Sequence, residues 1–184
     1  EINCLFNLGS ANAFNFAKKR NVYFHDLNLR SEKFMKGLIS LYGQPLRFIP
    51  SSFSPENQNP NPNECNREIT FAAPPFGLKS CSTRDLYPLE EDEDSQLINE
   101  VSCKMIYLAH KNTTKVTVAF ANLGVLFSKS LGTDYFREKL INNNWIDSII
   151  LLPPGTFSNT SIQGALLVLK KDRNLKDKIQ FIDF

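Results

Sequence analysis

One short segment combines two prolines, an aromatic ring and a glycine directly after an apolar stretch: Ala73, Pro74, Pro75, Phe76 and Gly77. Each proline fixes the backbone φ angle, so this loop should be stiff and extended. A stiff loop can project Phe76 from the edge of a sheet, where an aromatic ring can stack on a nucleobase. The residues alone favour equally a structural Pro-Pro turn that places Phe76 in the core.

Other candidate ligand-binding residues follow apolar runs in the first third of the chain. Gly9 ends the run 2–8, and a glycine turn there lets the backbone approach a nucleotide-like ligand. Asp26 follows the run 22–24, where a carboxylate can bind ribose hydroxyls. An aspartate at the end of a strand is more often a helix cap or a turn residue, so both interpretations of Asp26 stay open.

Short apolar runs alternate with helical patterns, which is typical of a parallel sheet covered by helices. The expected strands are 2–8, 22–24, 46–49, 68–72, 116–121, 146–152 and 165–169, with 179–184 as a candidate edge strand. The expected helices are 11–20, a segment from the Ser31 cap to Gly43, 96–110 and 133–143. Ligands of such doubly wound sheets bind beyond the carboxyl ends of the strands, which is where Gly9, Asp26 and Phe76 are expected.

The 184 residues suit a single domain, 1–184, with irregular loops at 51–68 and 79–94. The 21 basic and 19 acidic residues give a net charge of +2, so any nucleic-acid contact needs a local basic patch. The acidic run 90–94 predicts either a solvated face or the entry to a helix. The chain starts within an expected strand, which predicts missing upstream sequence.

The sequence predicts neither a zinc site nor membrane association. None of the four cysteines forms a C-x-x-C pair, and neither His25 nor His110 stands near a cysteine. Free cysteines of this kind are typical of a reducing, intracellular compartment. No apolar stretch is long enough to span a bilayer, and no secretion pattern begins the chain. The cysteines are Cys4, Cys65, Cys81 and Cys103.

Four motifs lie in a distinctive order in the last third of the chain. These are NLGVLF at 122–127, IDSIILLPPGTF at 146–157, NTSI at 159–162 and ALLVLKK at 165–171. In this order the chain resembles the methylation subunit of type I restriction–modification systems, an N-6 adenine DNA methyltransferase family. That family has a strand ending in P-x-G-V-L-F, a strand running into L-P-x-x-x-F, a T-x-I-P turn and a last strand that closes on lysines.

The resemblance implies a Rossmann-like class I methyltransferase fold. The expected sheet has seven mostly parallel strands, an antiparallel last strand and helices on both faces. The implied cofactor is S-adenosylmethionine, and the implied partners are DNA, a separate specificity subunit and other subunits of a larger complex. The resemblance also implies a helical domain upstream of the methyltransferase core.

The residues that would bind substrate and cofactor depart from the family pattern. The family loop after the fourth strand reads Asn-Pro-Pro-Phe or Asn-Pro-Pro-Tyr. Its Asn and first proline carbonyl accept hydrogen bonds from the adenine amine, and its aromatic ring stacks on the flipped base. Pro74, Pro75 and Phe76 match this loop, but Ala73 stands at the Asn position. At the cofactor positions Gly9 and Asp26 are kept. Asn7 and Ser51 stand where the family has acids, and Ala11 and Ala13 stand where it has glycines.

These departures predict a catalytically silent methyltransferase-like subunit that acts as a structural or nucleic-acid-binding partner. The alternatives are an active adenine-N6 methyltransferase subunit with atypical motifs, and an unrelated nucleotide-binding α/β module. An engineered knockout would explain Ala73 but not the other positions. The candidate DNA contacts are Phe76, Lys79, Lys129, Lys170 and Lys171, and the resemblance adds a loop near the target base that holds Asn159, Thr160 and Ser161.

Overall fold

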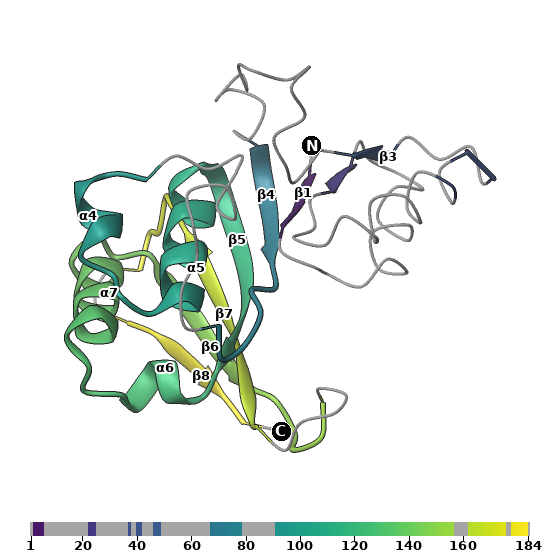
Figure 1. Cartoon of the computed structure of the whole chain (residues 1–184). Coiled ribbons are helices and arrows are strands. Elements are labelled where there is room, and N and C mark those ends of the chain that lie inside the picture. The colour runs from purple at the N-terminus through teal and green to yellow at the C-terminus, as the bar shows by residue number, and fades with distance from the viewer. Residues whose placement is uncertain are drawn as a thin grey trace.

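A computed structural model of the chain describes residues 2–5, 22–24, 37, 40–41, 46–48, 67–78, 91–156, 162–175 and 178–183. These residues form one mixed sheet with a layer of helices against it (Figure 1). The strands are β1 (Ile2–Leu5), β2 (Val22–Phe24), β3 (Leu46–Phe48), β4 (Arg67–Ala72), β5 (Thr113–Asn122), β6 (Ile146–Leu151), β7 (Gly164–Lys170) and β8 (Gln180–Ile182).

The order of the strands in the sheet is β3-β2-β1-β4-β5-β7-β6-β8. Strand β7 is antiparallel to both neighbours, β5 and β6, and the other described strand pairs are parallel. Every described strand except β7 therefore points the same way. As a result, the carboxyl ends of β1, β4, β5 and β6 meet at one edge of the sheet.

The expected mixed α/β sheet is confirmed, although it has eight strands and not seven. The seventh expected strand is β7, which is antiparallel as expected, and the eighth is β8, which lies within the candidate edge strand 179–184 and is parallel to β6. The expected loops are also shorter than predicted at their carboxyl ends. Strand β4 already begins at Arg67, and a helix begins at Glu93.

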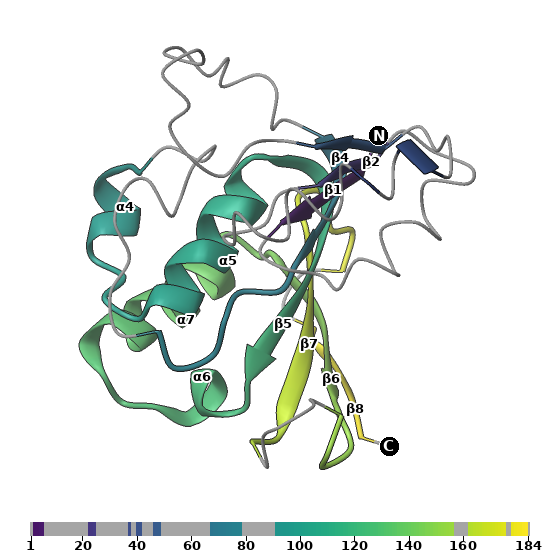
Figure 2. The ribbon, with the colours of Figure 1, turned by 45° about the vertical axis from the view of Figure 1, so that its right-hand side comes forward.

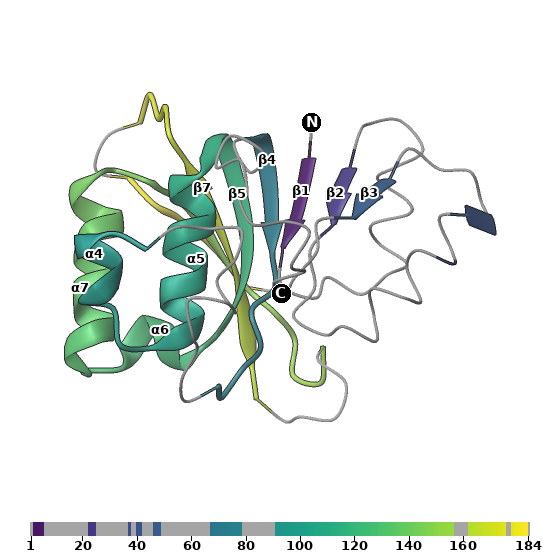
Figure 3. The ribbon, with the colours of Figure 1, turned by 45° about the horizontal axis from the view of Figure 1, so that its top comes forward.

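The helices described between β4 and β6 are α4 (Glu93–Gln96), α5 (Val101–Lys111), α6 (Gly124–Phe127) and α7 (Leu131–Asn142). Helices α4, α5 and α7 lie on one face of the sheet (Figures 2 and 3). Helices were expected on both faces of the sheet, and the described helices form a layer on this face. The helix expected at 11–20 lies outside them, and Gly37, Ser40 and Leu41 are the helical residues described between Ser31 and Gly43.

The helix expected at 96–110 begins only at Val101, as α5, and the separate helix α4 precedes it at Glu93–Gln96. The Glu100 carboxylate accepts the Cys103 backbone N–H at 2.6 Å and so caps a new helix, α5. Helix α4 has its own cap, because Asp92 and Ser95 each accept the other's backbone N–H, at 2.8 and 2.9 Å. Because each helix begins with its own capping bonds, α4 and α5 are separate helices.

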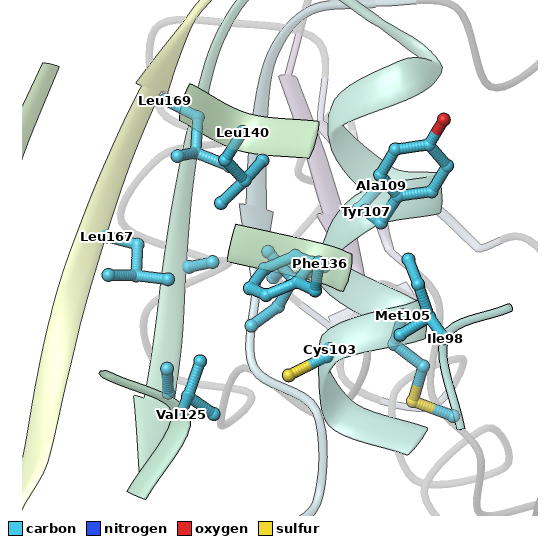
Figure 4. Packing of buried hydrophobic residues seen from close by; sticks show 14 of the residues in the cluster. Ile98, Cys103, Met105, Tyr107, Ala109, Val125, Phe136, Leu140, Leu167 and Leu169 are labelled. Carbon is cyan, nitrogen blue, oxygen red and sulfur yellow. The ribbon is translucent and has the colours of Figure 1, made fainter. Parts of the chain in front are cut away.

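The core lies between α5, α7 and the helix-facing side of β4 to β7 (Figure 4). Along β5 the side chains alternate, so Ala119 and Ala121 are buried against the helices while Phe120 and Asn122 are half-buried on the opposite face. Helix α7 contributes Phe136 and Leu140, four residues apart on one face, and both are almost fully buried. Burying each such side chain contributes about 1.5–3 kcal/mol.

The acidic run marks a helix entry rather than a freely solvated face. Glu91 pairs with Lys104 at 2.7 Å, and Asp92 pairs with Lys111. Asp94 accepts hydrogen bonds from Tyr135 Oη at 2.6 Å and Lys139 Nζ at 2.8 Å. The bonds from Lys139 and Tyr135 hold the pKa of Asp94 down to about 2. The run therefore ties α4 to α5 and α7.

A chain of polar side chains is buried between α5 and the sheet. His110 is fully buried, and its Nδ1 lies 3.0 Å from the Thr117 hydroxyl, which in turn lies 3.1 Å from the Thr113 hydroxyl. Thr113 donates to the Ala109 carbonyl at 2.7 Å and contacts Thr70 of β4. Burial, and secondarily the charge of Lys171, lowers the pKa of His110 to about 3, so the imidazole is neutral at physiological pH.

Candidate functional site

Three connections converge at the carboxyl edge of the sheet. Residues 73–78 follow β4, residues 123–127 follow β5 and residues 152–156 follow β6. Strand β1 ends at the same level, because its last residue, Leu5, pairs with Ala72 of β4. This edge is where the sequence predicted the site.

The loop after β4 runs from the buried interior to the surface. Ala72 is fully buried and Pro74 is buried, whereas Ala73, Pro75 and Phe76 are half-buried. Gly77 then takes a φ of +76°, in the left-handed region that favours glycine, and turns the chain away from β4. Phe76 is not one of the buried core side chains, so the alternative that places it in the core is wrong.

Ala73 brings only a methyl group to this loop. No side chain of residues 73–76 can form a hydrogen bond, so the hydrogen-bonding groups here are backbone groups. Neither Pro74 nor Pro75 has a backbone N–H. The loop can therefore offer carbonyl oxygens and an aromatic ring to a ligand. It cannot offer a side-chain hydrogen-bond acceptor at residue 73.

The connection after β5 is rigidly built, and the sequence analysis did not anticipate its short helix, α6. Asn122 Oδ1 accepts the Val125 N–H at 3.1 Å and caps this helix. A Cβ on Gly124 would lie 2.9 Å from that oxygen, so glycine leaves the room that the cap needs. At the other end Arg137 donates to the carbonyls of Val125 at 2.8 Å and Ser128 at 2.6 Å. An Asn three residues before a helical N–H is the pattern that would have predicted this cap.

The connection between β6 and β7 is tied to the end of β5. The Leu123 N–H donates to the Gln163 carbonyl at 3.0 Å, and the Leu152 N–H donates to the Gly164 carbonyl at 2.9 Å. Gln163 Nε2 also donates to the Leu152 carbonyl at 3.2 Å. These bonds fix the ends of the connection, while Asn159, Thr160 and Ser161 lie outside the described residues.

The residues expected to bind the cofactor fall outside the part of the chain that the structure describes. They are Asn7, Gly9, Ala11, Ala13, Asp26 and Ser51. The acceptor-side residues Ala73, Pro74, Pro75 and Phe76 are all described, and they lie together after β4. Because β1 and β4 end side by side, the chain leaving β1 starts beside this loop.

Two of the expected DNA contacts, Lys170 and Lys171, lie at the end of the sheet opposite Phe76. Lys170 pairs in register with Val116, near the start of β5, whereas Phe76 follows the end of β4. Lys170 also forms an ion pair with Asp147 at 2.8 Å, and Lys171 Nζ lies 4.4 Å from the centre of the Trp145 ring. Both lysines therefore lie apart from Phe76. Lys129 is exposed after α6, and Lys79 lies outside the described residues.

Cys103 and His110, both on α5, are structural. Cys103 is a buried free thiol, and burial raises its pKa, which leaves it unreactive. Both Cys103 and His110 lie on the buried side of α5. Within the described ranges, no group of three or more His, Cys, Asp and Glu side chains is arranged to hold a metal ion. Likewise, no described helix has the length and apolar character that a membrane crossing requires.

The arrangement of strands and helices is that of a methyltransferase. The methyltransferase subunit of a type I restriction–modification system from Streptococcus thermophilus superposes with a TM-score of 0.77 at 21% identity, covering 99% of this chain and 42% of that one. A modification subunit of a putative type I restriction enzyme from Vibrio vulnificus gives 0.68 at 16% identity, covering 97% and 45%. A putative class I S-adenosylmethionine-dependent methyltransferase from Listeria monocytogenes gives 0.63 at 11% identity, covering 99% and 58%.

The sequence identifies the family within this fold. Residues 47–184 match the N-6 DNA Methylase family, and the chain belongs to it. The chain is 29% identical over 139 residues to the methylase subunit of the type I restriction enzyme MpnII from Mycoplasma pneumoniae. The match covers 66% of this chain but only 23% of that subunit, so the chain spans about a quarter of its curated relative.

Proposed function

We propose that this chain is the methyltransferase-like domain of a type I modification subunit and that it does not transfer methyl groups. It serves instead as a structural or nucleic-acid-binding subunit. The observation that carries the proposal is Ala73, which follows β4 with a methyl group directly before Pro74-Pro75-Phe76.

Methyl transfer to adenine needs the exocyclic amine held so that its lone pair faces the methyl donor. A side-chain acceptor at residue 73 would hold that amine together with the Pro74 carbonyl. With Ala73 in this position one of the two contacts is missing. Removing one positioned hydrogen bond of this kind lowers a reaction rate by about 10²–10³-fold.

S-adenosylmethionine is the methyl donor implied by the family, and when bound it supplies an electrophilic methyl group. On the acceptor side, Ala73 does not fit the transfer. We extend the proposal to the donor side: Asn7 and Ser51 replace acidic residues, and Ala11 and Ala13 replace glycines, which weakens cofactor binding.

The prolines and the aromatic ring that remain in the loop after β4 suit base stacking rather than methyl transfer. Phe76 is half-buried on a stiff loop, so its ring is held in place at low entropic cost when a base stacks on it. The same retained Pro74-Pro75-Phe76 turn favours the second candidate function, an active adenine-N6 methyltransferase subunit with atypical motifs. The two candidates differ in whether methyl groups reach DNA.

The partners are proposed from the relatives. The MpnII protein is named as a methylase subunit, and the structure of a type I restriction–modification system is described in terms of complex assembly. We propose DNA, a specificity subunit and other subunits as partners of this chain.

The test combines calorimetric titration with S-adenosylmethionine and its demethylated product with a radiolabelled methyl-transfer assay on adenine-containing duplex. Wild type, Ala73→Asn and a control, Thr156→Asn, are compared. Thr156 is exposed at the same edge, after β6, so the control adds the same side chain elsewhere.

We expect no binding heat and no methyl incorporation for all three proteins, since the donor side is altered as well. Incorporation by the wild type would refute the proposal and establish the second candidate. Incorporation by Ala73→Asn alone would show that residue 73 by itself causes the silence, and it would refute the extension to the cofactor side.

A further inference from the structure

We infer that a cavity at the amino end of the sheet binds a phosphate group and that Lys171 is the cation that contacts it. The site lies at the end of the sheet opposite Phe76, so it is separate from the loop after β4. This inference deepens the nucleic-acid-binding part of the proposed function, because it supplies a contact to the backbone that does not depend on the base. It does not require methyl transfer.

The cavity lies where helix α7 ends and the chain leaves β7 (Figure 3). Residues 141–144 line it on one side and residues 171–174 on the other. Its volume of about 590 Å³ falls within the roughly 300–1,000 Å³ of small-ligand sites. The backbone beside it is fixed, since the Lys171 N–H donates to the Lys115 carbonyl at 3.0 Å. The cavity can therefore hold a small group such as a phosphate.

The ammonium group of Lys171 has hydrogen-bond donors to spare. Its Nζ lies 4.4 Å from the centre of the Trp145 ring and 3.4 Å from the Lys111 carbonyl oxygen, beyond the usual range of about 2.7–3.2 Å. Among the described residues no carboxylate forms an ion pair with it. Burial, and secondarily the charge of Lys111, lowers the pKa of Lys171. A bound anion would stabilise the charged form of this half-buried group.

Arg173 and Asn144 add a fixed positive charge and a free amide donor. The Arg173 side chain is only 4% exposed. Its Nη1 donates to Asn144 Oδ1 at 2.8 Å, and its Nη2 donates to the Lys178 carbonyl. Because Asn144 uses Oδ1 for this bond, its Nδ2 keeps its two N–H donors, and neither bonds to the residues that the structure describes. Asn144 also has a φ of +53°, so it turns the chain at the end of α7 and holds the amide at the cavity.

The simpler explanation is that Lys171 neutralises the carboxyl end of α7. That end already has its partners. The Lys139 carbonyl accepts the Asn143 N–H at 3.2 Å and Asn143 Nδ2 at 2.8 Å. The Leu140 carbonyl accepts the Trp145 N–H at 2.9 Å. The helix end therefore does not need Lys171, and the ammonium group remains available to a ligand.

The charges around the cavity favour an anion. Asp147 already faces two cations, Lys170 Nζ at 2.8 Å and Arg173 Nε at 3.7 Å. Asp172 is the carboxylate that lines the cavity, and it is exposed, so solvent screens it more than the half-buried Lys171. A backbone phosphate has two free oxygens, one for the Lys171 ammonium group and one for the Asn144 amide.

The experiment measures dissociation constants of the full chain by fluorescence anisotropy over a series of salt concentrations. The main probe is a labelled abasic phosphodiester oligomer of about 12 units, which has phosphates but no bases. An oligomer with uncharged methylphosphonate linkages tests the need for the phosphate charge. A polyglutamate peptide of the same length supplies carboxylates instead, and titration calorimetry tests inorganic phosphate.

The variants separate a phosphate ligand from the general charge of the surface. Lys171→Gln removes the unpaired cation, Lys171→Arg keeps its charge, and Asp172→Asn removes the opposing carboxylate. Lys115→Gln is the matched control, because Lys115 is an exposed lysine at the same end of the sheet that already pairs with Glu68. Melting temperatures confirm that each variant is folded.

We expect the wild type to bind the phosphodiester at least about tenfold more tightly than the methylphosphonate oligomer. Lys171→Gln should weaken this binding about fivefold and reduce the slope of log affinity against log salt by about 0.7. Lys171→Arg should retain most of the affinity, and Asp172→Asn should raise it about twofold. Lys115→Gln should stay within about twofold of the wild type, with an unchanged slope.

Two sources of phosphate are distinguished by the same proteins. Binding of the oligomer that depends on Lys171 identifies a nucleic-acid backbone as the ligand. Binding heat from inorganic phosphate that Lys171→Gln abolishes, without binding of the oligomer, identifies a free phosphate.

Three results would each overturn the inference. These are equal losses in Lys171→Gln and Lys115→Gln, a polyglutamate peptide that binds as tightly as the oligomer and with the same dependence on Lys171, and no binding of either phosphate probe. Methyl transfer is measured in parallel. Failure of the proposed silent function appears there as methyl incorporation by the wild type, and failure of this inference appears only in the affinities for the phosphate probes.

Discussion

The helical layer and the carboxyl edge of the sheet are built differently. In the helical layer, three acids of the run 90–94 form ion pairs, and Asp94 by itself binds Tyr107, Tyr135 and Lys139. At the edge, the residue that follows β4 is Ala73, and the polar side chains of Asn122 and Gln163 bind backbone groups. Among the described residues, charged interactions therefore concentrate in the helical layer, and the edge presents few ionisable side chains.

This difference separates stability from chemistry. Substitutions in the helical layer should change the free energy of unfolding and leave the binding surface intact. Substitutions at the edge should change ligand binding and leave the free energy of unfolding nearly unchanged. A large loss of stability on substitution of an edge residue would contradict this distinction. A negligible loss on substitution of a buried residue in the helical layer would contradict it too.

The largest effect is expected from Phe136→Ala. Phe136 is 0% exposed in the layer between α7 and the sheet, so its removal leaves a cavity and should lower the free energy of unfolding by about 4 kcal/mol. The matched control is Phe127→Ala, because Phe127 at the edge is 72% exposed and should change it by less than about 0.5 kcal/mol. Denaturant unfolding followed by circular dichroism measures both, and similar losses in the two variants would contradict the comparison.

Gly132→Ala should give the second largest effect. A Cβ on Gly132 would overlap the backbone nitrogen of Asn99, so the start of α7 must move away from the segment before α5. Such overpacking costs about 1–3 kcal/mol. Gly37→Ala serves as the control, since no atom of the described residues lies within 4 Å of the place that a Cβ would take there, and it should be neutral or stabilising. The measurement is the shift in denaturant midpoint at constant slope.

Because of His110 in the helical layer, the free energy of unfolding should depend on pH. Its folded pKa of about 3 lies below the unfolded value of about 6.5, so the unfolded chain binds a proton first as the pH falls. The stabilisation is complete above about pH 6.5 and is lost progressively below it, by up to about 1.4 kcal/mol per pH unit. His110→Phe should remove this slope between about pH 6.5 and 5, where most carboxylates stay ionised. Unfolding curves of the two proteins with parallel pH dependence would contradict the assignment.

Much of the fold could be predicted because strands leave a direct pattern in the sequence. Val22–Phe24 was predicted to the residue, and the bounds of β4, β6 and β7 differ by at most one residue at either end. The break between α4 and α5 was missed because the apolar spacing continues from Leu97 to Val101. The break depends on the capping bonds of Asp92 and Glu100, which periodicity does not record.

The site was predicted in part for a related reason. The Ala73–Phe76 loop was found because two prolines and an aromatic residue form a local pattern. The position of Lys170 and Lys171 relative to Phe76 could not be predicted, because it depends on the antiparallel direction of β7. The Asn122 cap was missed because a helix of four residues, α6, leaves little apolar periodicity in the sequence.

The sharpest test of the boundary between the two regions compares two adjacent alanines, of which Ala73 should give the smallest effect on stability. Ala72 is fully buried against the helical layer, whereas Ala73 is half-buried on the other face. Ala72→Asn buries an amide without a partner and should cost about 1–3 kcal/mol. Ala73→Asn can keep its amide in contact with water and should change the free energy of unfolding by less than about 0.5 kcal/mol. Comparable losses in the two variants would mean that residue 73 belongs to the packed interior, and Ala73 would then be a requirement of the fold rather than a lost binding group.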